Sequence, residues 1–351
     1  MPPYINAIGT ATPSHDIHPS FLAWARERVS PREMRLFDRM AARAGIEQRW
    51  SVLTAEPAPI GPDGFYGNNA VPGTAERMAI YAQAAPGLAV EAIERLAKKV
   101  PLGHITHLVV ASCTGFVAPG IDQIIARRLG LAFDVERLLI GFMGCYAAVA
   151  ALRSARHIVR SVPHARVLVI TVELSTLHMQ PDTTLEPLLA QLQFGDGAAA
   201  ALVTADPAGF SLDETFAAAL PHSDDLIRWT ITDQGFVMHL SGAVPNHISS
   251  ALAEPALRAS ITGGVDPATV DGWAVHAGGR SILDAVEHAF ALAPDALAAS
   301  RAVLRTAGNM SSATLMFVLE RLLAGPPVRE GRALAFGPGL AAEGFAFRSA
   351  A

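Results

Sequence analysis

The sequence is poor in cysteine, in aromatic residues and in charge. Its 351 residues include two cysteines, and aromatic and charged residues make up 7% and 17% of the chain. Two cysteines in so long a chain exclude a disulfide scaffold, and neither lies in a CxxC pair of the metal-binding kind. No HExxH motif, EF-hand loop or P-loop occurs either. We therefore expect no metal site and no bound cofactor.

Long apolar or basic runs are also missing. The longest apolar region, residues 138–152, is broken by Gly141 and Gly144 and is too short to span a membrane. The chain does not begin with a basic stretch followed by an apolar core, so we expect no signal peptide and a cytoplasmic protein. The formal net charge is −5 and no Lys/Arg cluster occurs, which argues against a nucleic-acid partner.

What the sequence does have is a high apolar content in alternating strand and helix patterns. Hydrophobic residues make up 51% of the chain, and its length exceeds what one core usually serves, so we expect an α/β protein with halves 1–207 and 208–351. The alternation predicts parallel strands joined by helical crossovers. The expected strands are 107–112, 137–140, 165–172, 198–203, 272–276, 332–336 and 344–348; the expected helices are 77–99, 121–129, 146–160, 281–292, 300–306 and 312–323; and residues 55–75 are expected to form a long loop.

Cys145 stands between a predicted strand and a predicted helix. A thiol at a helix N-terminus faces free N–H groups and the positive end of the helix dipole. We therefore expect a lowered pKa and a nucleophilic thiolate, although a buried structural cysteine is an equally plausible interpretation of this residue alone. For Cys113, which follows a strand in SCTGFVAPG, the wall of a pocket or core is the favoured interpretation.

A histidine and an asparagine occupy comparable positions in the second half. His276 ends the strand GWAVH before a Gly-rich turn, where open α/β sheets place their chemistry, and Asn309 lies in the Gly-Asn turn before an apolar helix. Each has an ordinary structural alternative, a core histidine and a helix cap. Together with Cys145 they supply a nucleophile, a base and an amide donor. Papain-type peptide hydrolysis and thioester condensation both use such a set, but the first lacks its usual sequence surroundings here.

Several segments resemble the chalcone-synthase-like family, the type III polyketide synthases. They are FMGCYAAVAALRSA, FGDGAAAALV, HAGGRSILDAVE, GNMSSATLMFVLE and FGPGLAAEG, in order and at suitable spacing, and SCTGFVAPGID is similar to the bacterial branch that makes alkylpyrones and alkylresorcinols. The resemblance spans about residues 30–348. It implies a thiolase-like five-layered αβαβα fold of two similar halves, the first carrying the nucleophile, and a homodimer.

The resemblance also implies roles for individual residues. Cys145 corresponds to the acyl-carrying nucleophile, and His276 and Asn309 to the pair that binds the malonyl thioester carbonyl. Phe194 corresponds to a gatekeeper, whereas the second gatekeeper position holds Met238. Arg39 and Arg43 match cations that hold CoA phosphate, while a third such position falls on Leu36, for which Arg35 could substitute. The remaining expected substrate-binding residues are Cys113, Thr114, Ala118, Gly278, Gly279, Ser311, Gly337 and Pro338, and Ala118 stands where a neighbouring subunit reaches across in plant members.

The expected reaction is a decarboxylative Claisen condensation of acyl-CoA with malonyl-CoA, with CoA thioesters as substrates. Donors at the enolate oxygen commonly supply the largest catalytic contribution. The alternatives are a ketoacyl-ACP synthase III-like enzyme and a non-enzymatic acyl-binding protein of the same fold. An enzyme of the hydroxymethylglutaryl-CoA synthase type requires a glutamate near the nucleophile, and no clear candidate precedes Cys145 on the matched segments. Four modest side chains, Cys113, Thr114, Ala118 and Met238, together with the bacterial resemblance, predict a medium- to long-chain fatty acyl starter.

Overall fold

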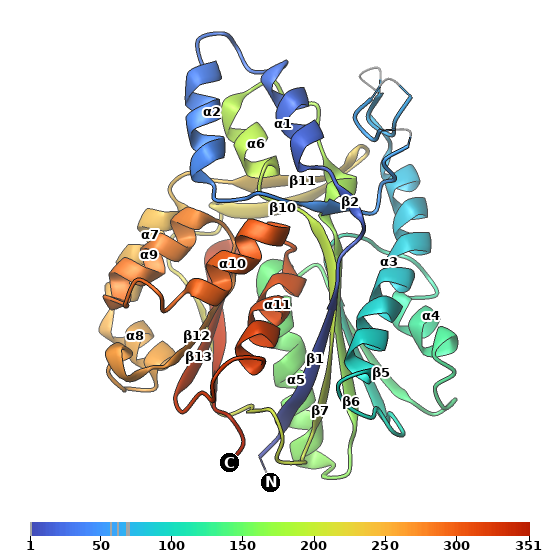
Figure 1. Ribbon diagram of the computed structural model, residues 1–351, viewed down its shortest axis with the longest axis vertical. Helices are drawn as coiled ribbons and strands as arrows, with labels where there is room; N and C mark the ends of the chain where they lie inside the picture. Colours follow the sequence, from blue (N-terminus) through green and yellow to red (C-terminus); the bar gives the residue numbers. More distant parts are fainter. Residues whose placement is uncertain (1, 57, 62, 68–70) are drawn as a thin grey trace.

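The computed structural model describes residues 2–56, 58–61, 63–67 and 71–351. The structure has five layers, which Figure 1 shows from right to left as helices, a large sheet, two central helices, a second sheet and a further group of helices. The αβαβα arrangement expected from the resemblance is therefore confirmed. Residues 57, 62 and 68–70 of the expected loop 55–75 lie outside the described residues.

The first sheet has the strand order β5-β4-β6-β7-β1-β8. Strand β4 is parallel to β5 and β6, whereas β7 is antiparallel to both β6 and β1. Strands β4, β6 and β7 are buried along their whole length because helices cover both faces of the sheet. The strands are β1 (Tyr4–Ala11), β4 (His107–Ser112), β5 (Glu136–Gly141), β6 (Val167–Leu174), β7 (Asp196–Thr204) and β8 (Phe210–Ser211).

The second sheet has the order β12-β13-β14-β9. Only β12 and β13 are parallel, and β14 is antiparallel to both of its neighbours. The strands are β9 (Thr215–Ala219), β12 (Gly272–Val275), β13 (Gly331–Gly337) and β14 (Ala341–Phe347), and the helices over the outer face are α7 (Val244–Ala253), α8 (Pro255–Thr262), α9 (Arg280–Phe290) and α10 (Ala298–Ala307).

Two helices form the central layer and pack against both sheets. Helix α5 (Ala147–Ser161) contacts β4, β6 and β14, and α11 (Ser312–Leu323) contacts β1, β6, β7 and β12. Both helices carry small side chains where they are buried. The fully buried alanines are Ala147, Ala148 and Ala151 of α5 and Ala313 of α11. Small side chains let helix and sheet backbones approach closely, so this layer holds the two halves together.

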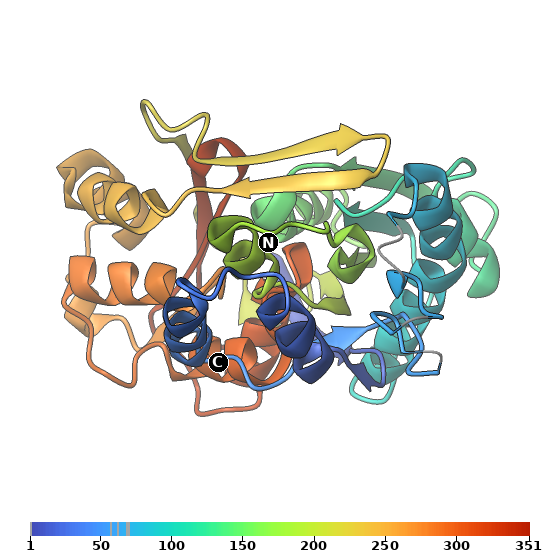
Figure 2. The same ribbon diagram turned by 90° about the horizontal axis from the view of Figure 1, so that it is seen from above.

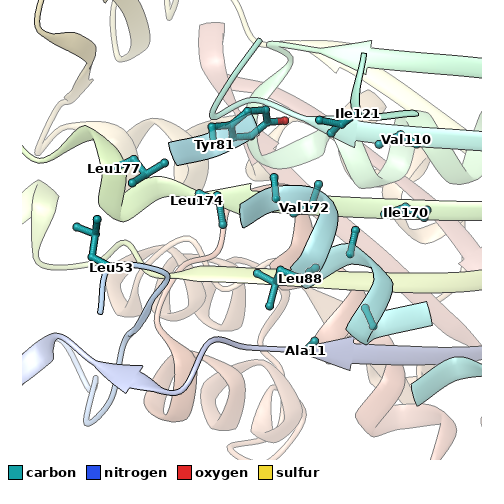
Figure 3. Packing of buried hydrophobic residues seen from close by; sticks show 14 of the residues in the cluster. Ala11, Leu53, Tyr81, Leu88, Val110, Ile121, Ile170, Val172, Leu174 and Leu177 are labelled. Carbon is teal, nitrogen blue, oxygen red and sulfur yellow. The ribbon is translucent and has the colours of Figure 1, made fainter. Parts of the chain in front are cut away.

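The outer face of the first sheet is covered by α3 (Thr74–Ala97) and α4 (Ile121–Arg128). Figure 3 shows Tyr81 and Leu88 of α3 in one apolar cluster with Val110, Ile170 and Val172 of the sheet. The hydroxyl of Tyr81 donates to Ser112 Oγ at 2.7 Å, so the polar tip of this buried ring is also satisfied.

A cap lies over one end of the layers, opposite the two termini (Figures 1 and 2). Its helices are α1 (His18–Arg26), α2 (Met34–Arg43) and α6 (Leu185–Gln191), and its strands are the pairs β2 (His15–Asp16) with β3 (Trp50–Ser51) and β10 (Ile227–Thr232) with β11 (Gly235–Leu240). No helix in the described part of the chain is long and apolar enough to cross a membrane.

The expected strands and helices are present with shifted ends. The expected parallel pairing is confirmed for β4–β5, β4–β6 and β12–β13, but the other pairs of the two sheets are antiparallel. Strands β13 and β14 are joined by a 3₁₀ turn, Pro338–Leu340, and such a short connection permits only antiparallel pairing. Strands β6 and β7 are joined through the cap rather than by a crossover beside the sheet. The chain changes sheets near residue 212, since β8 pairs with β1 and β9 with β14; the division at Pro207 stays a prediction.

Candidate active site

Cys145 lies in a tight turn between the two sheets. It belongs to the 3₁₀ turn Gly144–Tyr146, which leads directly into α5. Gly144 has φ +77°, and a Cβ there would lie 2.3 Å from Pro338 Cδ, so the position requires glycine on both counts. A Cβ on Gly337 would likewise lie 2.6 Å from Tyr146 Cδ1. Gly337 and Pro338 therefore pack directly against the turn that holds Cys145.

The expected low pKa of the Cys145 thiol is wrong. Burial raises its pKa to about 12, and the hydrogen bonds from Ser311 and Asn309 only partly oppose that effect, while the nearby Glu173 carboxylate raises it further. The thiol is 9% exposed, so the loss of hydration of the thiolate outweighs the helix N-terminus. In the free protein the side chain is a protonated thiol.

Asn309 joins three segments of the site. Its backbone N–H donates to Gln193 O at 2.7 Å, and its carbonyl accepts from Gly195 N–H at 3.0 Å, on the two sides of Phe194. Its side-chain Nδ2 donates to Gly278 O at 3.2 Å, and Oδ1 accepts from Ser311 N–H at 2.8 Å. These contacts orient the amide so that the second N–H of Nδ2 meets the Cys145 thiol.

Ser311 itself has φ +47°, an uncommon conformation for a residue other than glycine. Its position at the N-terminus of α11 is stabilised by the bond to Asn309 Oδ1 and brings its hydroxyl to the Cys145 thiol.

His276 follows β12 and is 2% exposed. Its backbone N–H donates to Leu334 O of β13, but neither ring nitrogen has a hydrogen-bond partner among the described residues. Burial lowers its pKa to about 3, so the ring is neutral at pH 7. Two unpartnered nitrogens in a buried ring are costly unless a ligand meets them. The next turn, Gly278 and Gly279, is bound to Asn309 through Gly278 O.

Phe194 and Met238 border one cavity of about 210 Å³. Phe194 faces the cavity while its backbone pairs with Asn309, so the cavity adjoins the Asn309 loop. Three aromatic side chains that the sequence did not indicate, His178, Trp229 and Phe236, complete its wall. The His178 and Phe236 rings stack with centroids 4.2 Å apart, so these two rings pack face to face in the wall.

Cys113, Thr114 and Ala118 do not line that cavity. Cys113 and Thr114 are fully buried at the end of β4, and Ala118 is exposed on the surface. The Cys113 sulfur contacts Gly144, the residue before Cys145. Contact of these three residues with substrate stays a prediction.

Glu173 is a buried acidic side chain that the sequence analysis did not identify. It is fully buried in β6, and burial raises its pKa to about 7 despite bonds from Ser312, Cys113 N–H and Thr114. The signal was present: Glu173 is the single charged residue in the strand VLVITVEL, and Lys, Glu, Arg and Asp are almost never fully buried without a partner. In the described residues, no group of three or more His, Cys, Asp and Glu side chains is placed to hold a metal ion.

Arg39 and Arg43 lie on α2 in the cap, four residues apart and exposed. Neither side chain has an ion pair with a described residue, so both are free to meet an anion. Arg35 is exposed on the same helix.

Comparison with known proteins decides the family. The N-terminal domain model of the chalcone and stilbene synthases matches residues 2–207, and the C-terminal domain model matches residues 211–351. The chain belongs to the chalcone and stilbene synthase family. Members of this family are polyketide-forming condensing enzymes, so the prediction of an acyl-transferring enzyme is confirmed, and the papain-type and ketoacyl-ACP synthase III-like alternatives are set aside.

Solved structures of similar proteins agree with this family. PKS-I from the brown alga Ectocarpus siliculosus is 29% identical, with a TM-score of 0.90 over 99% of this chain and 98% of that one. The C-terminal type III polyketide synthase domain of Steely1, a type I/III hybrid from Dictyostelium, shares the fold at 24% identity, with a TM-score of 0.91 and both chains fully covered. The thiolase-like fold is thereby confirmed, whereas the bacterial branch stays a prediction.

The raised pKa of Cys145 predicts its reactivity in the free protein. Because only the thiolate is alkylated and its pKa is about 12, the rate of iodoacetamide alkylation should rise about tenfold per pH unit from pH 7 to pH 10 without a plateau. Mass spectrometry of the Cys145 peptide measures that rate. The Cys145→Ala protein reports any labelling of Cys113, and a plateau near pH 8 in the unmodified protein would contradict the assignment.

Proposed function

We propose that this enzyme carries a starter acyl group on Cys145 and extends it with malonyl-CoA, using His276 and Asn309 as the donor pair. The observation that carries the proposal is the Asn309 side chain, which binds Gly278 beside His276 and Ser311 beside Cys145. The neutral His276 ring has unpartnered nitrogens, so it can accept the thiol proton during acylation and can donate an N–H to a carbonyl afterwards.

The condensation follows from the same groups. Loss of CO2 from the malonyl unit leaves its electron pair as an enolate. The enolate oxygen accepts hydrogen bonds from His276 and from the Asn309 N–H that meets Cys145 in the free protein. Preorganised donors in a buried site stabilise such developing charge strongly. The enolate carbon then attacks the thioester carbonyl on Cys145, and the sulfur leaves as a thiolate. The residues named suffice for these steps, so we propose CoA thioesters as substrates and no cofactor.

The separate half-reactions test these roles. In Cys145→Ala, starter acyl groups should no longer attach to the protein, because the accepting sulfur is gone. In His276→Ala and Asn309→Ala, CO2 release from malonyl-CoA should fall by about 10²-fold or more, the usual cost of an oxyanion donor. Mass spectrometry of the intact protein and labelled CO2 release measure the two steps.

His104 and Asn246 are exposed. The variants His104→Ala and Asn246→Ala are therefore matched controls, and their acylation and CO2 release should equal those of the unmodified enzyme. Covalent attachment of starter to Cys145→Ala would overturn the nucleophile, and near-normal CO2 release in both other variants would remove His276 and Asn309 from the chemistry.

The phosphates of CoA are assigned to Arg39 and Arg43 of α2. Their spacing places both guanidinium groups on one helix face, and both are exposed without an ion pair. Guanidinium groups suit phosphate through paired N–H donors. Leu36, which occupies the third expected position, is 38% exposed and supplies no charge.

Charge reversal separates phosphate binding from a general role of α2. The double variant Arg39→Glu/Arg43→Glu should raise KM for malonyl-CoA at least about tenfold, because the charge-assisted hydrogen bonds to phosphate are lost. Turnover of N-acetylcysteamine thioesters, which lack these phosphates, should be unchanged. The double reversal of Arg127 and Arg128, exposed on α4, is the control. Equal losses with both substrate types would contradict the assignment.

The sequence analysis predicts a medium- to long-chain fatty acyl starter, and within that range we propose a medium-chain acyl group. The wall formed by Phe194, Met238, Phe236 and Trp229 suits a hydrocarbon chain, and each buried CH2 contributes about 0.8 kcal/mol. The four small side chains named in the sequence analysis do not share a cavity, however, and a cavity of about 210 Å³ lined by aromatic rings limits the length of the chain. Alkylpyrones or alkylresorcinols are the corresponding proposed products.

A panel of acyl-CoA starters measures this limit. We expect kcat/KM to peak between hexanoyl- and lauroyl-CoA, and Trp229→Ala to move the peak towards palmitoyl-CoA because it enlarges the cavity. Ile231→Ala, on the same strand but 50% exposed, is the control. A preference for acetyl- or an aromatic acyl-CoA, or an unchanged profile in Trp229→Ala, would defeat the proposal.

We further propose a cytoplasmic homodimer. Strand β5 is the edge of the first sheet, and Leu138 and Leu139 on it, with Phe116 beside the loop of Ala118, are 42–46% exposed. An apolar sheet edge readily pairs with a second copy, and this pairing places Ala118 near the partner.

A further inference from the structure

Cys113 holds the residue that precedes the nucleophile. Its Sγ accepts the N–H of Gly144 at 2.9 Å and lies 3.5 Å from the carbonyl oxygen of the same residue, to which the thiol can donate. Both backbone groups of Gly144 are thus bound by one side chain. The backbone here has positive φ at Phe142 and Gly144, and a turn of this kind needs contacts that maintain it.

Cys113 is itself anchored from the opposite side. The Glu173 carboxylate accepts the Cys113 N–H and the Thr114 hydroxyl, each at 2.9 Å, and its other oxygen accepts the Ser312 hydroxyl. Thr114 Oγ1 in turn accepts Leu174 N–H at 2.8 Å. The end of β4 is therefore bound to β6 and to the start of α11, and the Cys113 side chain has little freedom to move.

We propose that Cys113 is a positioning residue whose thiol holds Gly144 by its N–H and carbonyl groups and so sets the position of the Cys145 sulfur for acylation. The inference rests on the proposed nucleophilic role of Cys145. It accounts for a buried thiol that lines no part of the Phe194 cavity.

The chemistry of the thiol supports this role. The double contact requires the S–H form, because a thiolate cannot donate to the Gly144 carbonyl. Burial and the Glu173 charge raise the pKa of Cys113 well above its ordinary value, so the proton stays on sulfur.

The test compares acylation with decarboxylation in Cys113→Ala and Cys113→Ser. Alanine removes both contacts and leaves Gly144 N–H unsatisfied, so single-turnover acylation of Cys145 should slow about tenfold, with KM for the starter unchanged. CO2 release from malonyl-CoA, which depends on His276 and Asn309, should be unaffected. A serine hydroxyl can accept and donate as the thiol does, so Cys113→Ser should recover most of the acylation rate.

Thr171→Val is the matched control, because Thr171 is fully buried in β6 and its hydroxyl has no partner in the described structure. Normal acylation in Cys113→Ala, or equal slowing of acylation and CO2 release, would overturn the inference. If Cys113→Ala does not fold, Thr114→Val is the second variant. It removes the hydroxyl that donates to Glu173 and accepts Leu174 N–H, and it leaves the Glu173 carboxyl group in place. Selective slowing of acylation supports the role, and normal acylation overturns it. Absence of acyl-Cys145 in the unmodified enzyme would instead refute the proposed function.

Discussion

The close packing of two helices between two sheets is the constraint on which this structure depends. Helices α5 and α11 are buried on both sides, and their alanines let the sheets approach from either direction. Both helices begin at the same end of the layers, so the residues just before them, Cys145 and Asn309, meet there. His276 reaches the same place from the end of β12. A bulkier central layer would separate the groups that the proposed chemistry needs together.

Burial in that layer also sets the charge states. Removal of water outweighs the helix N-terminus at Cys145 and keeps His276 neutral. The site of the free enzyme therefore holds a thiol, an imidazole with unpartnered nitrogens and an oriented amide. Nearby lies Glu173, the one acidic residue of β6. It accepts hydrogen bonds from Cys113 after β4 and from Ser312 of α11, and so links these two segments. A neutral, preorganised site of this kind suits a reaction in which negative charge develops on substrate oxygen.

Reaction and selectivity are assigned to different parts of the molecule. The proposed chemical groups lie on the five layers, whereas Trp229, Phe236 and Met238 come from the β10–β11 hairpin of the cap. The Phe142 ring, three residues before Cys145, stacks on Trp229 with centroids 6.1 Å apart. The cap can therefore change the shape of the cavity while the packing of α5 and α11 stays the same.

The sequence by itself indicated the family through its matching segments, and the long helices and buried strands through apolar periodicity and glycine-bounded turns, which are local signals. It also singled out Cys145, His276 and Asn309, whose catalytic roles are proposals. It did not indicate β1, interrupted by Asn6 and Gly9, or the β10–β11 hairpin, whose alternation is half polar. Antiparallel pairing, the cavity wall and the contact of Cys113 with Gly144 depend on residues far apart in the chain. The high pKa of Cys145 was likewise decided only by the tertiary structure, because desolvation depends on everything packed around the thiol and not on the turn that presents it.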